Sequence, residues 1–222
     1  MNEEFYEREI VTSGDGSFTI FLPHFNEHYH SHHGAVQESQ HVFMKMGWEE
    51  AIKGKSSISI LEVGFGTGLN AWLVYEASGR TGSPKVHYVS LESFPVDVSM
   101  AQQLNYSDRV EEFTMLHTAP WNESVALSDS YTLEKLQCSL LDFVPSGKYD
   151  LIFFDAFAPR VQPELWTKDV FDKIFNAMNP DGILVTYCSK GDVRRNMIAA
   201  GFTVEKVPGP PGKREMLRAR KM

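Results

Sequence analysis

The segment 61–70, LEVGFGTGLN, carries the clearest chemical signature in the chain. Its glycines, Gly64, Gly66 and Gly68, would permit a tight turn and a close approach of a ligand to the backbone of a strand-to-helix loop. Pyrophosphate-binding loops have the spacing Gly-x-Gly-x-x-Gly, whereas this loop has Gly-x-Gly-x-Gly. Glu62, just before the loop, suits a cationic ligand. The segment therefore predicts a site for a positively charged small molecule.

Two further carboxylates follow neighbouring predicted strands. Glu92 comes 24 residues after Gly68 and could accept hydrogen bonds from ribose hydroxyls. Asp142 ends the third predicted strand and could contact an adenine. S-adenosylmethionine carries an ammonium, a sulfonium, a ribose and an adenine but no phosphate, so we expect it as the cofactor. An ordinary strand-to-helix turn and a nicotinamide site are the alternatives.

The segment 155–159, DAFAP, directly follows the apolar run 151–154. In doubly wound sheets the ligand crevice lies at the carboxyl ends of the strands, so Asp155 would face the transferred group. Amine-methylating enzymes often place here a polar side chain that holds the amine and an aromatic ring, here Phe157, that stacks on a planar base. A helix cap is the structural alternative for Asp155. Its occurrence together with the glycine loop favours catalysis.

Histidines are concentrated near the N-terminus, where six of the eight lie within eighteen residues: His24, His28, His30, His32, His33 and His41. A metal site would need several of them to converge with a carboxylate such as Glu27 or Glu38. No cysteine lies nearby, and nothing in the spacing fixes such a geometry. We expect no metal ion, and interpret the segment as a polar lid over the cofactor that titrates near neutral pH.

Charge is unevenly distributed along the chain. The net charge of −8 argues against a nucleic-acid partner, but residues 190–222 alone carry nine Lys and Arg against three acidic residues, a local charge of +6. This asymmetry predicts a basic patch on an acidic body, with a solvated surface as the alternative. The residues expected to contact nucleic-acid phosphates are Lys190, Arg194, Arg195, Lys213 and Arg214.

Strand and helix patterns alternate from residue 58 onward. The predicted strands are 58–63, 85–91, 151–154 and 183–187, and the predicted helices are 69–77, 97–104, 167–178 and 192–200. Such alternation indicates parallel strands with helices on both faces, a doubly wound α/β sheet. Residues 125–141 are predicted as a hairpin running into a strand that ends at Asp142. Residues 202–207 and 215–219 are predicted as an antiparallel pair.

The first part of the chain has a different pattern. It predicts a hairpin from residues 9–12 and 17–22, the histidine-rich loop, and a helix over 35–46. We therefore expect an N-terminal extension, residues 1–56, followed by a cofactor-binding core, residues 57–222. A chain of 222 residues with 42% apolar residues is long enough to bury one core.

Composition also limits the cellular setting. The two cysteines, Cys138 and Cys188, lie in apolar runs and cannot form a disulfide framework, which indicates a reducing compartment. Residues 1–5, MNEEF, are acidic where a signal peptide would be basic, and no run of eighteen apolar residues follows. We predict a cytoplasmic protein that does not associate with membranes.

The order and spacing of several motifs resemble the methyltransferase half of the bacterial bifunctional tRNA-modifying enzyme MnmC. The motifs are the segments 37–43 (QESQHVF), 60–70, 92–95 (ESFP), 155–159, 163–166 (PELW) and 213–216 (KREM). The resemblance extends from about residue 16 to residue 219. It implies a class I S-adenosylmethionine-dependent methyltransferase fold, Rossmann-like and mostly parallel with an antiparallel C-terminal strand.

The resemblance also implies an activity, the N-methylation of 5-aminomethyl-(2-thio)uridine at the wobble position of tRNA. It assigns the amine to Asp155 and Phe157, and the cofactor to Glu62, Gly64, Phe65, Gly66, Gly68, Asn70, Glu92 and Asp142. MnmC carries a flavin-dependent oxidase half after this domain, whereas this chain stops at Met222. The resemblance thus implies the stand-alone type, MnmD, which needs no FAD, receives its aminomethyl group from another enzyme and shows no obligate protein partner.

Direct displacement is the mechanism that these residues predict, with a neutral amine attacking the sulfonium methyl group. A carboxylate of ordinary pKa is a poor base for an alkylammonium, so we expect Asp155 to orient the amine. A methyltransferase or aminopropyltransferase-like enzyme acting on a small amine or a protein side chain is one alternative, which the basic C-terminal segment disfavours. A non-enzymatic RNA-binding or cofactor-sensing module is another, which the Asp155 motif disfavours.

Overall fold

The structure, a computed structural model, describes residues 7–222, so the acidic segment 1–5 lies outside the described residues. An eight-stranded sheet forms the centre, with the order β10-β11-β9-β8-β4-β5-β7-β6. Its strands are β4 (Ser57–Val63), β5 (Lys85–Leu91), β6 (Ser124–Ser128), β7 (Tyr131–Leu136), β8 (Tyr149–Phe154), β9 (Met178–Thr186), β10 (Thr203–Pro208) and β11 (Glu215–Arg220).

The strand order reverses at β4, which is parallel to both of its neighbours, β5 and β8. From β4 the chain proceeds outward through β5 to β7 and then returns to β8 and β9 on the opposite side. Such a reversal creates a crevice at the carboxyl ends of the strands, where doubly wound sheets bind ligands. The predicted fold class is confirmed, and so is the antiparallel C-terminal pair, because β11 pairs antiparallel with both β9 and β10.

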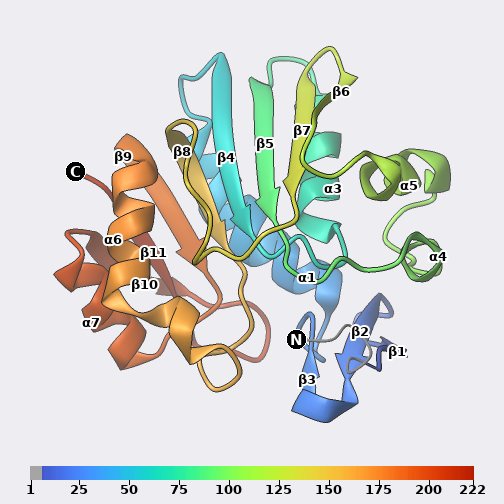
Figure 1. The fold of residues 1–222 in the computed structure, drawn as a ribbon, viewed down its shortest axis with the longest axis horizontal. Coiled ribbons are helices and arrows are strands. Elements are labelled where there is room, and N and C mark those ends of the chain that lie inside the picture. The colour runs from blue at the N-terminus through green and yellow to red at the C-terminus, as the bar shows by residue number, and fades with distance from the viewer. Residues whose placement is uncertain (1–6) are drawn as a thin grey trace.

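Helices cover both faces of the large sheet, with α6 in front of it and α3 behind it in Figure 1. The helical segments are α1 (Ala35–Ser39), η3 (Gln40–Trp48), α2 (Glu49–Ala51), α3 (Leu69–Ser78), α4 (Val98–Ala101), α5 (Val110–Thr118), α6 (Lys168–Ala177) and α7 (Gly191–Ala199), with short 3₁₀ turns η2 (Pro23–Phe25) and η4 (Pro163–Trp166). The two faces bury separate apolar clusters, one beneath η3 and α3 and one beneath α6 and α7.

Helix α6 shows how the sequence determines this packing. Thr167 caps its N-terminus by accepting a hydrogen bond from the Val170 backbone N–H, as its sequence position predicts. Ile174 follows Phe171 by three residues and Val170 by four, so the three side chains share one face and are buried against the sheet.

The N-terminal residues form a small three-stranded antiparallel sheet of β1 (Glu9–Thr12), β2 (Phe18–Leu22) and β3 (Glu27–His28). Figure 1 places this sheet beyond the carboxyl ends of the central strands. The helix that follows continues to Ala51, five residues past the predicted end, and is π-helical over η3. Because β3 leads back toward the crevice, the extension can contribute side chains to it.

The predicted strand ending at Asp142 is wrong, because β7 ends at Leu136. The chain turns at Ser139, whose Oγ accepts a hydrogen bond from the Leu141 N–H at 3.2 Å, and whose carbonyl accepts one from the Asp142 N–H at 3.1 Å. Leu140 is buried by this turn, whereas Asp142 is exposed. The apolar residues after position 136 thus belong to a turn that packs on the core rather than to a longer strand.

The turn between β10 and β11 packs against the histidine-rich loop. A Cβ atom on Gly212 would lie 2.3 Å from the His33 ring, and the φ angle of Gly212 is +83°, so this contact requires glycine. His41 reaches the same turn through its Nε2, which lies 2.7 Å from the Pro208 carbonyl oxygen. The N-terminal extension and the C-terminal hairpin therefore meet beside the crevice.

Candidate active site

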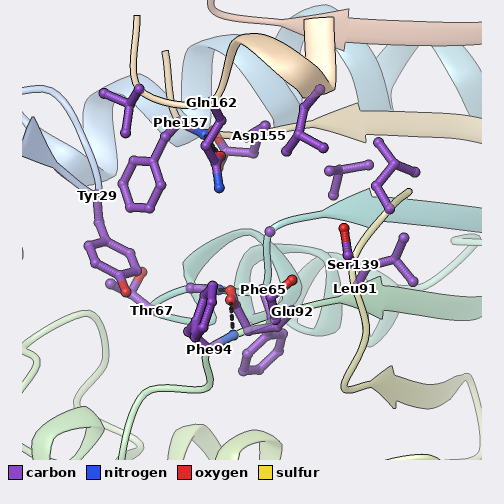
Figure 2. Close-up of a pocket in the computed structure, with 18 of the residues that line it drawn as sticks. Tyr29, Phe65, Thr67, Leu91, Glu92, Phe94, Ser139, Asp155, Phe157 and Gln162 are labelled. Carbon is purple, nitrogen blue, oxygen red and sulfur yellow. Dashed lines mark hydrogen bonds between the residues drawn. The ribbon is translucent and has the colours of Figure 1, made fainter. Parts of the chain in front are cut away.

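A cavity of about 560 Å³ lies where β4, β5 and β8 end. Figure 2 shows Asp155 and Phe157 on one side of this cavity and Glu92 and Phe94 on the other. The predicted site residues that line it are Gly64, Phe65, Gly66, Asn70, Glu92, Asp155 and Phe157. Loops far apart in the sequence thus meet at one edge of the sheet, as expected for loops that follow parallel strands.

The glycine loop is bonded to the loop that follows β5. The Gly66 N–H donates to Oε2 of Glu92 at 2.9 Å, and the Phe94 N–H donates to Oε1 at 2.8 Å. These two bonds fix the carboxylate at the cavity wall, and each oxygen keeps a further lone pair. Glu92 is therefore oriented to accept hydrogen bonds from vicinal hydroxyl groups of a ligand.

The aromatic ring of Tyr29, in the N-terminal extension, covers the glycine loop. A Cβ atom on Gly66 would lie 3.0 Å from the Tyr29 ring, and the φ angle of Gly66 is +49°, so only a bare backbone allows Tyr29 to approach. Tyr29 also packs edge-on against Phe157, with ring centroids 5.1 Å apart. Figure 2 shows these two rings together at one end of the cavity. The extension thus forms one wall of the cavity.

Two arginines hold this wall in place. Arg160, in the loop after β8, donates to the Asn26 carbonyl at 3.0 Å and pairs with Glu27 at 2.8 Å. Arg8 donates to the carbonyls of Phe94 at 2.6 Å and Pro95 at 2.9 Å. The extension is therefore tied to both sides of the crevice.

Asp155 directly follows β8 and is half-buried, and its Oδ2 accepts a hydrogen bond of 2.8 Å from Nδ2 of Asn70. Burial raises the pKa of Asp155 well above its ordinary value, the charges of Glu38 and Glu62 raise it further, and the Asn70 bond and Lys213 lower it. A carboxylate with a raised pKa is a stronger base than an exposed one. The sequence alone indicated an Asp155 of ordinary basicity.

Glu62 does not line the cavity. Its side chain is fully buried beneath the glycine loop, where Oε2 accepts a hydrogen bond of 2.6 Å from the Ser90 hydroxyl. Burial raises the pKa of Glu62 to about 8. Gly68 and Asp142 are also outside the lining of this cavity, and Gly68 packs against the His117 ring instead. Their assignment to the cofactor stays a prediction.

A second cavity of about 310 Å³ adjoins the first. Asp155 and Phe157 line both cavities, and so do Tyr29 and His30. The far wall of the second cavity comes from the histidine-rich loop, from Glu38 and from the C-terminal hairpin turn. Asp155 thus lies where the two cavities adjoin.

Lys213 points into the second cavity. Its Nζ lies 2.9 Å from Oε1 of Glu38 and 4.3 Å from the centre of the Tyr187 ring, whose hydroxyl donates to the Ala156 carbonyl at 2.9 Å. Oε2 of Glu38 accepts a bond of 2.7 Å from the Ser31 N–H. The prediction that Lys213 reaches outward to phosphate therefore does not fit its placement, because a buried carboxylate attracts its ammonium group inward.

The other predicted phosphate contacts do not line this cavity. Lys190 and Arg214 are exposed, Arg194 is half-buried, and Arg195 pairs with Asp192 on the first turn of α7. Lys190 immediately precedes α7, and Tyr187 is the first residue after β9. The role of these four residues in binding RNA remains a prediction.

The histidines separate into different environments. His30 is buried, with Nε2 2.7 Å from the Thr67 hydroxyl in the glycine loop, and burial lowers its pKa to about 4. His28, His32 and His33 line the second cavity. Within residues 7–222, no three His, Cys, Asp or Glu side chains are arranged to hold a metal ion. The same described residues contain no helix long and apolar enough to cross a membrane.

Comparison with known proteins identifies the family. Residues 102–222, more than half of the chain, match the family described as S-adenosyl-L-methionine-dependent methyltransferase. The chain belongs to this family. The cofactor of the methyltransferase is therefore S-adenosylmethionine, as the glycine spacing and Glu92 predicted.

Curated relatives of the methyltransferase carry a tRNA-related name. A protein of Chromobacterium violaceum named tRNA 5-methylaminomethyl-2-thiouridine biosynthesis bifunctional protein MnmC is 32% identical over 209 residues, which cover 86% of this chain and 32% of the relative. A protein of the same name from Methylobacillus flagellatus is 31% identical over 218 residues, which cover 90% of this chain and 33% of the relative. The methyltransferase spans about a third of the length of these relatives.

Solved structures support the same fold. MNMC2 from Aquifex aeolicus has a TM-score of 0.78 at 28% identity, covering 98% of this chain and 72% of that chain. Spermidine synthase from Thermotoga maritima has a TM-score of 0.63 at 11% identity, covering 98% of this chain and 69% of that chain. At that identity the likeness shows the fold alone. The class I architecture of the methyltransferase is confirmed.

Several lining residues were not predicted from the sequence. Tyr29 lies in the histidine-rich segment that we interpret as a lid, but no motif in the sequence marks its ring. Glu38, a candidate metal ligand from the sequence, pairs with Lys213 instead. Tyr187 is the last residue of a predicted strand and belongs to no motif in the sequence. Each of these contacts joins residues more than a hundred positions apart or depends on the conformation of a loop. The spacing of residues in the sequence could not reveal either.

Proposed function

We propose that this methyltransferase N-methylates the aminomethyl group of 5-aminomethyl-(2-thio)uridine at the wobble position of tRNA. The relatives named MnmC and the likeness to MNMC2 support the choice of substrate. The observation that carries the proposal is the position of Asp155, which lines both the cofactor cavity and the adjoining acidic cavity. An amine entering the second cavity would meet this carboxylate at the junction.

The first cavity fits the cofactor. Glu92 would hold the ribose hydroxyls, the glycine loop would back the ligand, and Tyr29 would close one end. Bound S-adenosylmethionine supplies an electrophilic methyl group on a positively charged sulfur. A bound cofactor would displace water from this space, which would strengthen the electrostatic interactions of the polar groups that line it.

The second cavity fits an amine on a planar base. Three carboxylates line it, Glu27, Glu38 and Asp155, and the first two already have cationic partners, Arg160 and Lys213. Asp155 is therefore the carboxylate open to an incoming ammonium group. Phe157 and Tyr187 supply aromatic surfaces on which a pyrimidine could stack.

Asp155 also suits the proton transfer that the reaction requires. An alkylammonium has no lone pair, so the amine must lose a proton before it attacks. The raised pKa of Asp155 brings the carboxylate closer to the pKa of an amine, which makes proton transfer less unfavourable. We therefore assign Asp155 as the group that accepts this proton and orients the nitrogen lone pair toward the first cavity.

A methyl-transfer assay tests this function. The purified protein is incubated with labelled S-adenosylmethionine and either tRNA carrying 5-aminomethyluridine or a small polyamine. We expect label at the wobble nucleoside of the tRNA, and none when tRNA lacking the aminomethyl group replaces it. Transfer to the polyamine but not to tRNA would instead support an enzyme for small amines. Absence of transfer to any of these acceptors would contradict the proposal.

A further inference from the structure

The turn that follows β7, residues 137–143, forms part of the first cavity, and the mechanism above gives it no role. Its residues that line the cavity are Cys138, Ser139, Leu140 and Leu141. Ser139 closes the turn, because its Oγ accepts from the Leu141 N–H at 3.2 Å and its carbonyl accepts from the next two N–H groups at 3.1 and 2.9 Å. These bonds shape the turn internally and leave the carbonyls of residues 140, 141 and 143 for other donors.

A lysine of α6 binds these three carbonyls. Nζ of Lys173 donates to the carbonyl oxygens of residues 140, 141 and 143 at 3.0, 2.6 and 3.2 Å. An ammonium group has three N–H donors, so all three are used on this turn. Hydrogen bonds from a charged donor are roughly twice as strong as those between neutral groups. Because Phe171 and Ile174 anchor α6 in the core, Lys173 ties the turn to a fixed element.

The order of the strands places the base of the cofactor at this turn. Asp155 follows β8, the glycine loop follows β4, Glu92 follows β5 and the turn follows β7, and these strands are neighbours in the order β8-β4-β5-β7. A ligand with its sulfonium near Asp155 and its ribose at Glu92 therefore extends its base toward the turn. Figure 2 shows Ser139 at the end of the cavity opposite Tyr29. Leu140, which is buried, supplies apolar surface for a planar ring there.

We propose that Lys173 is a positioning residue for S-adenosylmethionine, which holds the turn 137–143 in the conformation that recognises adenine. The bonds to Lys173 and to Ser139 leave the N–H groups of Ser139 and Leu140 for a ligand. In the described part of the chain, neither of these two N–H groups donates to a protein acceptor. The ring nitrogens of adenine are hydrogen-bond acceptors, so they match such donors. The role concerns the cofactor alone and does not depend on which amine is methylated.

Calorimetry with two ligands tests this role. S-adenosylhomocysteine and S-inosylhomocysteine differ only in the base, and hypoxanthine presents an N–H at N1 where adenine presents an acceptor. We expect the wild-type protein to bind the adenine ligand more tightly. K173M removes the three bonds at a similar side-chain length, so it should weaken binding of the adenine ligand about ten-fold, the value of about one hydrogen bond. It should also reduce the preference for adenine.

Two further variants separate this role from general effects of substitution. Lys168→Met is the matched control, because Lys168 lies on the same helix and pairs with Asp172 rather than with the turn. It should keep the wild-type affinity and preference. K173R should bind the adenine ligand more tightly than K173M, since a guanidinium can donate to the same carbonyls.

Cys138 gives a second reading at the turn itself. Its thiol lines the cavity, whereas Cys188 is 5% exposed, so alkylation by iodoacetamide followed by peptide mass spectrometry reports on the turn. Burial raises the pKa of the Cys138 thiol and Lys173 lowers it, so each variant is compared with itself, with and without ligand. We expect S-adenosylhomocysteine to protect Cys138, and K173M to need about ten-fold more ligand for the same protection.

Several results would overturn the proposal. Equal binding of the two ligands by the wild-type protein would show that the turn does not recognise the base. Wild-type affinity, preference and protection in folded K173M would show that Lys173 does not position the turn. A loss of affinity with an unchanged preference for adenine would indicate that Lys173 only stabilises the fold. Neither experiment contains tRNA, so these results are independent of whether the proposed function holds.

Discussion

Nδ2 of Asn70 donates a hydrogen bond of 2.8 Å to Oδ2 of Asp155, which joins the first turn of α3 to the loop after β8. The two elements carry the two motifs that dominate the sequence, the glycine loop and DAFAP. The backbone strengthens this junction, because the Asp155 N–H donates to the Val63 carbonyl at 3.1 Å. These two bonds therefore join the glycine loop and its helix to the loop that carries the proposed amine-binding carboxylate.

Glu62 should make stability depend on pH. Its pKa is about 8 in the folded protein and about 4.5 in the unfolded chain, so between these values the folded state binds more protons. The free energy of unfolding should consequently fall as pH rises from 4.5 to 8, by at most about 1.4 kcal/mol per pH unit from this group. Urea denaturation at several pH values should show this fall in wild type and a shallower one in E62Q. If the free energy of unfolding changed with pH equally in wild type and E62Q, the raised pKa of Glu62 would be contradicted.

Arg160 should matter for cofactor affinity more than for stability. R160A removes the bonds to the extension that places Tyr29 over Gly66. Because the Arg160 side chain is exposed, we expect a stability loss of about 1 kcal/mol or less. Calorimetry should show S-adenosylmethionine affinity reduced about three- to ten-fold. Arg109→Ala, which breaks exposed ion pairs with Glu76 of α3 and Glu112 of α5, is the control and should leave affinity unchanged. Equal effects of both variants would contradict a lid role.

Lys213 and Arg214 are adjacent in sequence but should act differently. R214A should weaken tRNA binding and reduce the salt dependence of affinity by about one unit of log–log slope, as the loss of one phosphate contact predicts. K213A should leave that slope nearly unchanged and lower the methyl-transfer rate, since Lys213 pairs with Glu38 inside the second cavity. Fluorescence anisotropy across a salt series checks the first effect and single-turnover kinetics the second. Identical behaviour of the two variants would argue against the inward role.

Candidate site residues could be predicted from the sequence where they directly follow a correctly predicted strand. The glycine loop, Glu92 and Asp155 were predictable because parallel strands deliver their carboxyl ends to one edge of the sheet. Asp142 was misplaced because the apolar residues of the turn after β7 imitate a continuing strand, and hydrophobicity does not report the Ser139 turn. Helix α5 was not predicted from the sequence, and it buries only Phe113, Leu116 and His117.

The second cavity could not be predicted from local patterns. It requires the extension to fold back over the crevice and the C-terminal turn to bring Lys213 to Glu38, a contact across 175 residues. The local excess of Lys and Arg predicted that Lys213 belongs to a basic surface. In the structure Lys213 turns inward because it pairs with the buried carboxylate of Glu38. Which acidic group a lysine pairs with depends on the tertiary fold. The sequence could therefore indicate the basic segment but not which of its residues points inward.

Substitution of Asp155 tests most directly whether methyl transfer takes place between the two cavities. Single-turnover methylation of tRNA carrying 5-aminomethyluridine is measured at saturating S-adenosylmethionine and across pH, for wild type, D155N and D155A. If Asp155 accepts the proton, both variants should keep cofactor affinity within a few-fold and lose about 10²–10³ in rate. The wild-type rate should rise with pH as Asp155 ionises. Wild-type rates in both variants would contradict the placement of the active site between the two cavities.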